Sequence, residues 1–287
     1  MSERTHPSAD ELSSLTTLQL LETMQSEDRR AVDAVGGILI KVAEAVDAIA
    51  DRVRAGGRLH YFGAGTSGRL AALDAAECPA TFGIPGDLVQ AHDAGDGEAE
   101  DDAVKGSDTA RLARLSSRDA VIGISAGGRT AYVLGAIAEA RAAGALVVGL
   151  TCAPGSPLGA AADVAIEIDT GPEVIAGSTR LKAGTAQKVT LNMISTAVFT
   201  KLGHTYKGRM VGVVGANEKL RGRAARLVGE LTGASGEQVA QALADAGGSA
   251  KVAILMLRCG VAAQEARARL STAGGDLAAA LGEATAR

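Results

Sequence analysis

Five short runs of strand-forming residues alternate with helical patterns through much of the chain, and this alternation constrains the fold more than any other feature. The runs cover residues 58–62, 88–92, 120–124, 146–150 and 164–168. Helical patterns separate most of them, as in residues 130–143. Apolar strands separated by helices pair in parallel through crossover connections. The sequence therefore predicts an α/β fold with a doubly wound parallel sheet.

Helices are predicted on both sides of this α/β region. Residues 15–53 carry helical periodicity in two segments that meet near Gly36-Gly37, and a longer apolar helix is expected over residues 185–202. Beyond about residue 215 the patterns are helical, and Ser235 and Gln238 fit the two ends of a capping box. The expected C-terminal helices cover residues 218–231, 250–258 and 262–270. We therefore expect three parts: N-terminal helices that pack on the α/β domain (1–55), the α/β domain itself (56–215) and a small helical domain (216–287).

Composition excludes several classes of partner. A net charge of −4, with three Tyr, three Phe and no Trp, leaves no basic or stacking surface for nucleic acid. No apolar run is long enough to span a membrane, and the polar N-terminus lacks the core of a signal peptide. The three cysteines are odd in number and have no CxxC spacing, which excludes a disulfide framework and a zinc ribbon. We expect a cytoplasmic protein.

A glycine-rich loop follows the first predicted strand. Its sequence, Gly-Ala-Gly-Thr-Ser-Gly over residues 63–68, matches GxGxxG between a strand and a helix, which is typical of dinucleotide sites. The second strand, however, ends in His92-Asp93, without a clear acidic residue to hold a ribose. Gly65, Thr66 and Ser67 instead offer hydroxyl and backbone N–H groups at a helix N-terminus, which suits a phosphate monoester. The third interpretation is that this loop is only a tight turn and binds no ligand.

The loop after the third predicted strand repeats this chemistry. Residues 125–130 read Ser-Ala-Gly-Gly-Arg-Thr, so that Ser125, Gly127, Arg129 and Thr130 supply hydroxyls, an open backbone and a cation. Helix capping and glycine turns explain each loop separately. Two loops of one composition favour a phosphosugar pocket, because ligands of open α/β sheets bind beyond the carboxyl ends of the strands.

A third polar segment precedes the long apolar helix. It contains Ser178, Thr179, Arg180 and Lys182, and Ser178 is a further candidate phosphate ligand with Lys182 as a cationic neighbour. A turn followed by a solvated lysine is the alternative. The histidines His60, His92 and His204 are far apart in the sequence and lack the spacing of metal ligands, so we interpret them as core or surface residues.

Four motifs in these segments resemble one known family, the N-acetylmuramic acid 6-phosphate etherases, which are built on the sugar isomerase (SIS) domain, a flavodoxin-like fold. The motifs are GAGTSGRLAALDAAECPATFG at residues 63–83, ISAGGRTAYV, GPEVIAGSTRLKAGTAQK and NEKL at residues 217–220. The resemblance extends from about Thr16 through the C-terminal helices. Animal glucokinase regulators are similar but carry two SIS domains on a longer chain.

The resemblance implies a lyase that converts N-acetylmuramic acid 6-phosphate to N-acetylglucosamine 6-phosphate and D-lactate, without a metal or redox cofactor, in cell-wall amino-sugar recycling. Glu77 falls on the family's proton-donor position. Asp108 aligns with the family's second carboxylate, which is a Glu, and Gly127 stands where the family commonly has a Ser. A non-catalytic phosphosugar sensor is the first rival, and a dinucleotide-dependent enzyme is the second.

The distance between the expected phosphate and proton-transfer groups raises a geometric question. If a helix begins at Ser67 and ends at Glu77, its ten-residue rise is roughly 15 Å, too long for one sugar phosphate to touch both ends. Either this helix breaks early or Glu77 serves the site of a second subunit. Related SIS enzymes commonly work as dimers with composite sites, so we expect a homodimer in which Glu77 acts across the interface.

Overall fold

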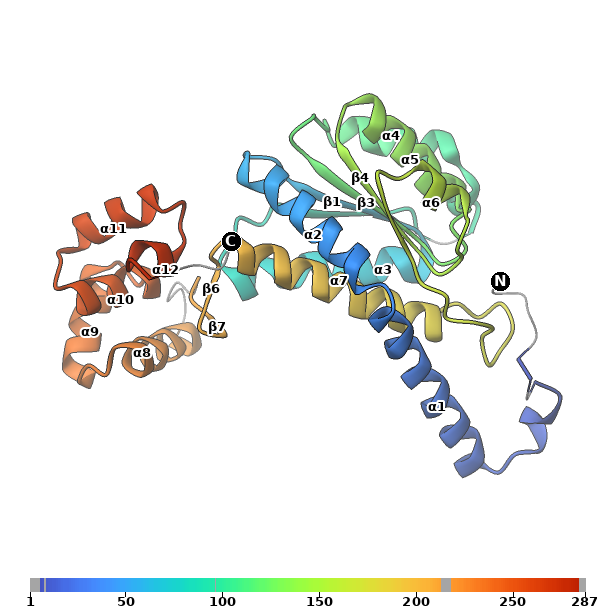
Figure 1. Ribbon diagram of the computed structural model, residues 1–287, viewed down its shortest axis with the longest axis horizontal. Helices are drawn as coiled ribbons and strands as arrows, with labels where there is room; N and C mark the ends of the chain where they lie inside the picture. Colours follow the sequence, from blue (N-terminus) through green and yellow to red (C-terminus); the bar gives the residue numbers. More distant parts are fainter. Residues whose placement is uncertain (1–5, 8, 96, 213–217, 284–287) are drawn as a thin grey trace. The chain divides into compact units, whose positions relative to one another are not determined.

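The structure is a computed structural model that describes residues 6–7, 9–95, 97–212 and 218–283. The chain divides into two compact units (Figure 1). The first contains residues 1–76 and 87–195, and the second contains residues 77–86 and 196–287. The second unit thus takes in more of the chain than the helical domain expected over residues 216–287.

The first unit is built on a five-stranded parallel sheet, as predicted. Its strands follow the five expected runs, with the spatial order β2-β1-β3-β4-β5. This is the flavodoxin-like order of a doubly wound sheet. The strands are β1 (Leu59–Gly63), β2 (Val89–Asp93), β3 (Ala120–Ser125), β4 (Leu146–Thr151) and β5 (Val164–Glu167). The sequence pattern revealed this architecture because strands β1, β3 and β4 are buried along their whole length and therefore apolar throughout.

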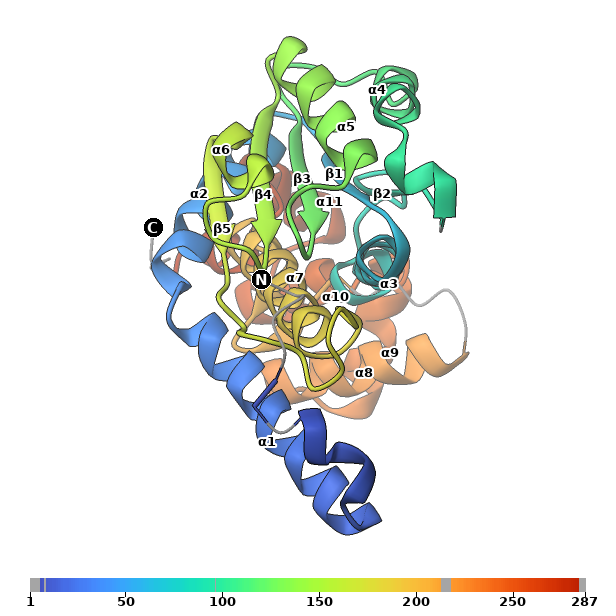
Figure 2. The ribbon, with the colours of Figure 1, turned by 90° about the vertical axis from the view of Figure 1, so that its right-hand side faces the viewer.

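Helices cover both faces of the sheet (Figure 1; Figure 2). One face carries α4 (Ala103–Leu112), α5 (Ala131–Ala142) and α6 (Pro157–Ala161), with the short 3₁₀ helix η2 (Gly97–Asp101) nearby. The other face carries α2 (Leu39–Arg54), which packs on β3, β4 and β5. Helices α3 (Gly65–Phe82) and α7 (Lys182–Lys201) belong to this second face, where Tyr61 of β1 donates to Asp74 of α3, which also accepts from Asn192 and Ser195 of α7.

The N-terminal segments confirm the predicted interruption. After the 3₁₀ helix η1 (Ala9–Ser14), α1 (Thr17–Gly36) begins with a capping box between Thr16 and Gln19. It ends at the expected Gly36-Gly37 pair, and α2 begins two residues later. Most of α1 is exposed, and only Glu27, Ala31 and Val35 are buried.

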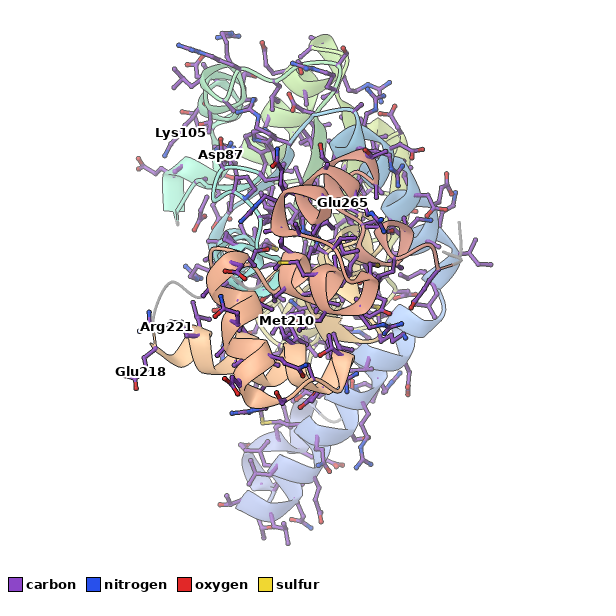
Figure 3. All side chains as sticks on the ribbon, turned by 90° about the vertical axis from the view of Figure 1, so that its left-hand side faces the viewer. Asp87, Lys105, Met210, Glu218, Arg221 and Glu265 are labelled. Atoms are coloured by element: carbon purple, nitrogen blue, oxygen red, sulfur yellow. The ribbon has the colours of Figure 1, made fainter. Side chains whose placement is uncertain are left out.

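The second unit is mainly helical, as predicted for the C-terminal region. It contains α8 (Glu218–Thr232), α9 (Gly236–Asp245), α10 (Ala250–Cys259), α11 (Ala263–Thr272) and α12 (Leu277–Ala280), which pack around one apolar core. The Ser235–Gln238 capping box is present at the start of α9. Figure 3 shows Glu218 and Arg221 at the beginning of α8. Asn217, the first residue of the NEKL motif, lies outside the described residues.

Sequence reasoning missed a small hairpin in this unit. Strands β6 (Thr205–Tyr206) and β7 (Arg209–Met210) pair antiparallel. The two residues between them, Lys207 and Gly208, both have positive φ, which is the geometry of a tight primed turn. A lysine at the first turn position is an unusual choice, and two-residue strands are too short to produce an alternating pattern.

Two histidines that are distant in the sequence meet inside the first unit. His60 of β1 and His92 of β2 place Nδ1 and Nε2 3.1 Å apart, and both rings stack with their neighbours on the sheet. His60 is completely buried, and its Nε2 has no hydrogen-bond partner among the described residues. Burial, and then the charges of His92 and Arg58, lower the pKa of His60 to about 4. Both histidines are therefore neutral core residues at pH 7, and the pairing is a consequence of sheet register.

We predict that His60 makes the protein less stable in mild acid. Its folded pKa of about 4 lies below the unfolded value of 6.5, so its contribution is complete above pH 6.5 and is lost as the pH falls toward 4. The full loss is on the order of 3 kcal/mol, of which about half falls between pH 6.5 and 5. Urea unfolding of the wild type and His60→Gln across this range measures it. The variant should show a shallower pH dependence, and identical slopes would contradict the prediction.

Candidate active site

From β1 the chain continues to β2 on one side of the sheet, whereas β3, β4 and β5 follow on the other side. The predicted binding loops lie at this switch point between β1 and β3. Strands β1 and β3 are neighbours, with Gly63 opposite Ile124 at their carboxyl ends. The β1 loop (residues 63–68) and the β3 loop (residues 125–130) leave the sheet there. In open α/β sheets the crevice at such a switch point is the place where ligands bind. The topology thus brings together two loops that are far apart in the sequence.

The β1 loop is wound so tightly that a side chain at Gly63 would collide with backbone and one at Gly68 with the Asp93 side chain. A Cβ on Gly63 would lie 2.7 Å from the backbone nitrogen of Gly68, and one on Gly68 would lie 2.0 Å from Oδ1 of Asp93. Gly65 has a φ of 56° and already begins α3. Thr66 and Ser67 therefore lie in the first helical turn, whose backbone N–H groups lack helical partners and favour an anion. The predicted placement of these hydroxyls at a helix N-terminus is confirmed.

The β3 loop holds its own hydroxyls together. Ser125 accepts a hydrogen bond from the backbone N–H of Gly128 at 3.0 Å, and its Oγ lies 2.8 Å from Oγ1 of Thr130. Thr130 is the N-cap residue of α5, and Arg129 is exposed. A Cβ added to Gly127 would meet no atom within 4 Å. The loop therefore has room for the larger residue that the resemblance associates with this position.

The last residue of β4 and the residue after it form hydrogen bonds to the β3 loop. The backbone N–H of Cys152 donates to the carbonyl of Ala126, and Thr151 donates its hydroxyl to the same oxygen. Burial, and then the charge of Glu173, raise the pKa of the Cys152 thiol to about 12. Cys152 therefore stays protonated, and its role here is packing and not nucleophilic attack.

The start of α7 is capped by a residue that sequence reasoning missed. The helix begins at Lys182, three residues before its predicted start, and the buried carboxylate of Glu173 accepts the backbone N–H groups of Lys182 and Ala183, each at 2.9 Å. A carboxylate is favoured at this end of a helix by the dipole and the free N–H groups. Glu173 lies nine residues before the helix, which is too far for any capping pattern to reveal it.

Lys182 forms an ion pair inside the protein. Its Nζ contacts the carboxylate of Glu27 on α1, and both side chains are buried. Glu27 also faces Arg30 at 3.0 Å and His6 at 3.4 Å. Burial opposes ionisation of Glu27, but the hydrogen bonds from Lys182, Arg30 and His6 outweigh it and lower the pKa. Lys182 thus fixes the exposed helix α1 to the start of α7, and its predicted role beside a phosphate stays a prediction.

The beginning of α7 lies against the β1 loop. A Cβ on Gly184 would be 3.5 Å from both the methyl carbon of Thr66 and the carbonyl oxygen of Thr179. One turn further, Ser67 donates its hydroxyl to Oε1 of the buried Gln187 at 2.9 Å. The structure therefore brings Thr66, Ser67 and Thr179 together around α7. Ser178 is partly exposed in the turn before this helix. Gln187 is a second residue that sequence reasoning missed.

The two predicted proton-transfer residues lie on exposed helical surfaces. Helix α3 continues without a break through Glu77 to Phe82, which excludes an early break, the first of the two alternatives. Glu77 is exposed, and so is Leu73 one turn before it. Asp108 lies on α4, exposed and 2.7 Å from Arg111. Both carboxylates are thus exposed in the single chain.

The described part of the chain contains neither a membrane-spanning helix nor a group of metal ligands. None of its helices is both long and apolar enough to cross a membrane. Within the same residues, no three His, Cys, Asp or Glu side chains are grouped so that they could hold a metal ion.

Comparison with known proteins defines first the class of this fold. A SIS domain model matches residues 102–197, and the model of the glucokinase regulatory protein N-terminal SIS domain matches residues 41–141. A phosphoheptose isomerase from Neisseria gonorrhoeae superposes with a TM-score of 0.51 at 19% identity, covering 64% of this chain and all of that one. A putative phosphosugar isomerase from Bacteroides fragilis gives 0.52 at 22% identity, covering 66% and 94%. The first unit is thus a SIS domain.

Full-length relatives then give the family. An N-acetylmuramic acid 6-phosphate etherase from Rubrobacter xylanophilus is 50% identical over 292 residues, which covers 99% of this chain and 96% of the relative. An etherase of the same name from Mycolicibacterium smegmatis is 47% identical over 280 residues, covering 95% and 94%. The chain belongs to the N-acetylmuramic acid 6-phosphate etherase family.

We predict that the buried ion pair is needed for stability. Lys182→Met leaves Glu27 buried without its main counter-ion and should lower the free energy of unfolding by about 3 kcal/mol. The double variant Glu27→Met/Lys182→Met should recover most of the loss, because two apolar side chains replace the pair. Lys188→Met, an exposed position on the same helix, is the control. Urea unfolding measures all four proteins, and equal effects of Lys182→Met and Lys188→Met would refute the role.

Proposed function

We propose that this protein is a lyase that cleaves the D-lactyl ether of N-acetylmuramic acid 6-phosphate in the cytoplasm, releasing N-acetylglucosamine 6-phosphate and D-lactate for amino-sugar recycling. The observation that carries the proposal is the pair of hydroxyl-bearing loops at the switch point, in a chain that matches named etherases along nearly its whole length. None of the three cysteines Cys78, Cys152 and Cys259 forms a disulfide, which suits a reducing compartment.

The phosphate group of the substrate is held between the β1 loop, the β3 loop and the turn before α7. Hydroxyls and unpaired N–H groups at two helix starts, α3 and α5, converge at neighbouring strand ends. This set of donors fits a doubly charged, compact anion better than a dinucleotide. The proposed binding residues are Gly65, Thr66, Ser67, Ser125, Gly127, Arg129, Thr130, Ser178, Thr179 and Lys182.

The reaction needs two groups that transfer protons. In the open-chain sugar, the C1 aldehyde acidifies the hydrogen at C2, and a base removes this proton while an acid protonates the departing ether oxygen at C3. The C3–O bond breaks, lactate leaves, and water adds to the unsaturated aldehyde with the two roles reversed. Each such group contributes about 10²–10⁴-fold to the rate. We assign these roles to Glu77 as the acid and Asp108 as the second carboxylate.

Both carboxylates lie beside exposed apolar side chains, which supports a homodimer. Leu73, four residues before Glu77, is 52% exposed. Val104 and Leu112, four residues on either side of Asp108, are 70% and 82% exposed. Side chains four apart share one face of a helix, so Glu77 shares its face with one exposed apolar side chain and Asp108 with two. A second copy that covers these helical faces would bury both carboxylates in the interface.

The two carboxylates should be essential to turnover but not to binding. We predict that Glu77→Gln and Asp108→Asn lower kcat for lactate release by at least about 100-fold and change KM by only a few-fold, because proton transfer stabilises the transition state alone. Asp108→Glu should retain activity. The exposed Glu237 provides the control variant Glu237→Gln. Retained turnover in Glu77→Gln would remove this residue from the mechanism.

The same lactate assay on the wild type separates the enzyme from its main rival. A folded protein that binds the phosphosugar without releasing lactate would be a non-catalytic phosphosugar sensor.

Mixing inactive subunits tests whether Glu77 acts across a dimer. Subunits with Ser67→Ala/Ser125→Ala keep Glu77, and subunits with Glu77→Gln keep both loops. In a heterodimer that works in trans, one site is complete, so exchange at equal concentrations should restore about one quarter of the wild-type activity by statistical pairing. Native mass spectrometry verifies that heterodimers form. Heterodimers without activity would show that Glu77 serves its own chain.

A further inference from the structure

A buried amide lies directly behind one of the proposed phosphate ligands. Gln187 of α7 is 1% exposed, and Ser67 in the β1 loop is also buried. Their Oε1 and Oγ atoms lie 2.9 Å apart, with the hydroxyl as donor. The other end of the amide, Nε2, is buried and has no hydrogen-bond partner among the described residues. Buried donors without partners are rare, so this one calls for an explanation.

The contact is part of the packing of α7 on the β1 loop. Gly184 lies three residues before Gln187 and therefore on the same side of the helix. At Gly184 a Cβ would lie 3.5 Å from Thr66 and 4.0 Å from Leu70, both on the first turns of α3. Gly184 therefore lies at the contact between α7 and α3, one turn before the place where the Gln187 amide reaches Ser67. Neither side chain can turn away into solvent.

The direction of the Ser67 hydrogen bond decides what Ser67 can offer to a phosphate. A serine hydroxyl has one proton, and a proton donated to Oε1 of Gln187 is not available to a ligand. The oxygen and nitrogen of a glutamine amide have nearly the same shape, and rotation of the amide by half a turn exchanges them. In the rotated state Nε2 donates to Ser67 Oγ, which frees the Ser67 proton and gives the buried N–H group a partner.

We propose that Gln187 is a positioning residue for phosphate binding: its amide donates to Ser67 Oγ when the sugar phosphate is bound and so directs the Ser67 proton to a phosphate oxygen. The proposal rests on the phosphosugar site assigned above. It explains why an amide and not a carboxylate lies here, because a carboxylate only accepts and would hold the Ser67 proton away from the ligand. The Gln187 amide itself does not touch the phosphate.

A double-variant cycle tests whether Gln187 acts through Ser67. Isothermal titration calorimetry gives Kd for N-acetylglucosamine 6-phosphate with the wild type, Ser67→Ala, Gln187→Met and the double variant. Ser67→Ala should weaken binding about 10-fold or more, since it removes a hydrogen bond to a charged group. Gln187→Met should weaken it several-fold alone but have no effect in the Ser67→Ala background. Independent, multiplying effects of the two substitutions would overturn the proposal.

The control lies on the same helix. Thr190 is completely buried, and its hydroxyl bonds only to the carbonyl of Ala186 among the described contacts. Thr190→Val perturbs the interior of α7 without touching the β1 loop, so it should leave Kd unchanged. If Thr190→Val weakens binding as much as Gln187→Met, Gln187 has a merely structural effect and the proposal fails.

Gln187→Glu supplies a second readout that packing alone would not move. The ionised glutamate accepts the Ser67 proton and adds a negative charge, whereas the protonated acid has an O–H that can donate as Nε2 does. Its loss of affinity relative to the wild type, measured at each pH, should therefore shrink as the pH falls from 8 to 5. A loss that is independent of pH would contradict the proposal. This variant also replaces Gln187→Met in the cycle if circular dichroism shows that the methionine variant is unfolded.

Failure of this proposal differs from failure of the etherase assignment. The calorimetric cycle measures equilibrium binding and does not require turnover. A protein that binds the sugar phosphate with the expected coupling but releases no lactate would refute the assigned reaction and leave the role of Gln187 intact.

Discussion

The N-terminus of α7 is the point on which the rest of the first unit depends. Two buried carboxylates meet there: Glu173 satisfies the first backbone N–H groups, and Glu27 neutralises the ammonium group of Lys182. The helix start is thereby fixed beneath the switch point of the sheet, next to the β1 loop. Since α1 contributes Glu27, the N-terminal helix takes part in holding the segment that the signature sequence GPEVIAGSTRLKAG encodes. That motif thus has a structural role.

A second constraint comes from the close approach of backbone at the β1 loop. Gly63 and Gly68 lie so near each other and Asp93 that any side chain would collide. The resulting tight turn exposes the N–H groups that begin α3, and Gln187 supports it from α7. The loop that we propose for anion binding therefore packs against Asp93 of β2 and Gln187 of α7. By contrast, the carboxylates proposed for the chemistry lie on open helical faces. The groups proposed for proton transfer are therefore exposed in the single chain, whereas the loop proposed for binding is packed against its neighbours. The homodimer that we propose would cover these faces.

Other reactive-looking side chains serve packing. The thiol of Cys152 stays protonated because it is buried beside Glu173, and His60 and His92 stay neutral because desolvation and the charge of Arg58 lower the pKa of each. These residues surround the sheet near the proposed site, yet their protonation states at pH 7 are fixed. The hydroxyls of the two loops are therefore the groups that we propose for anion binding.

The sequence alone determined the sheet, the two loops and the family, because each depends on local pattern. A buried parallel strand is a continuous apolar run, and the loops follow such runs directly. The sequence by itself therefore indicates Ser67 and Ser125 as candidate phosphate ligands. Partners that join distant segments could not be predicted in this way. Glu27 and Lys182, or Ser67 and Gln187, are separated by more than a hundred residues, and no periodicity links them. Only the tertiary structure placed these pairs, because burial and hydrogen bonding depend on which helices the sheet brings side by side.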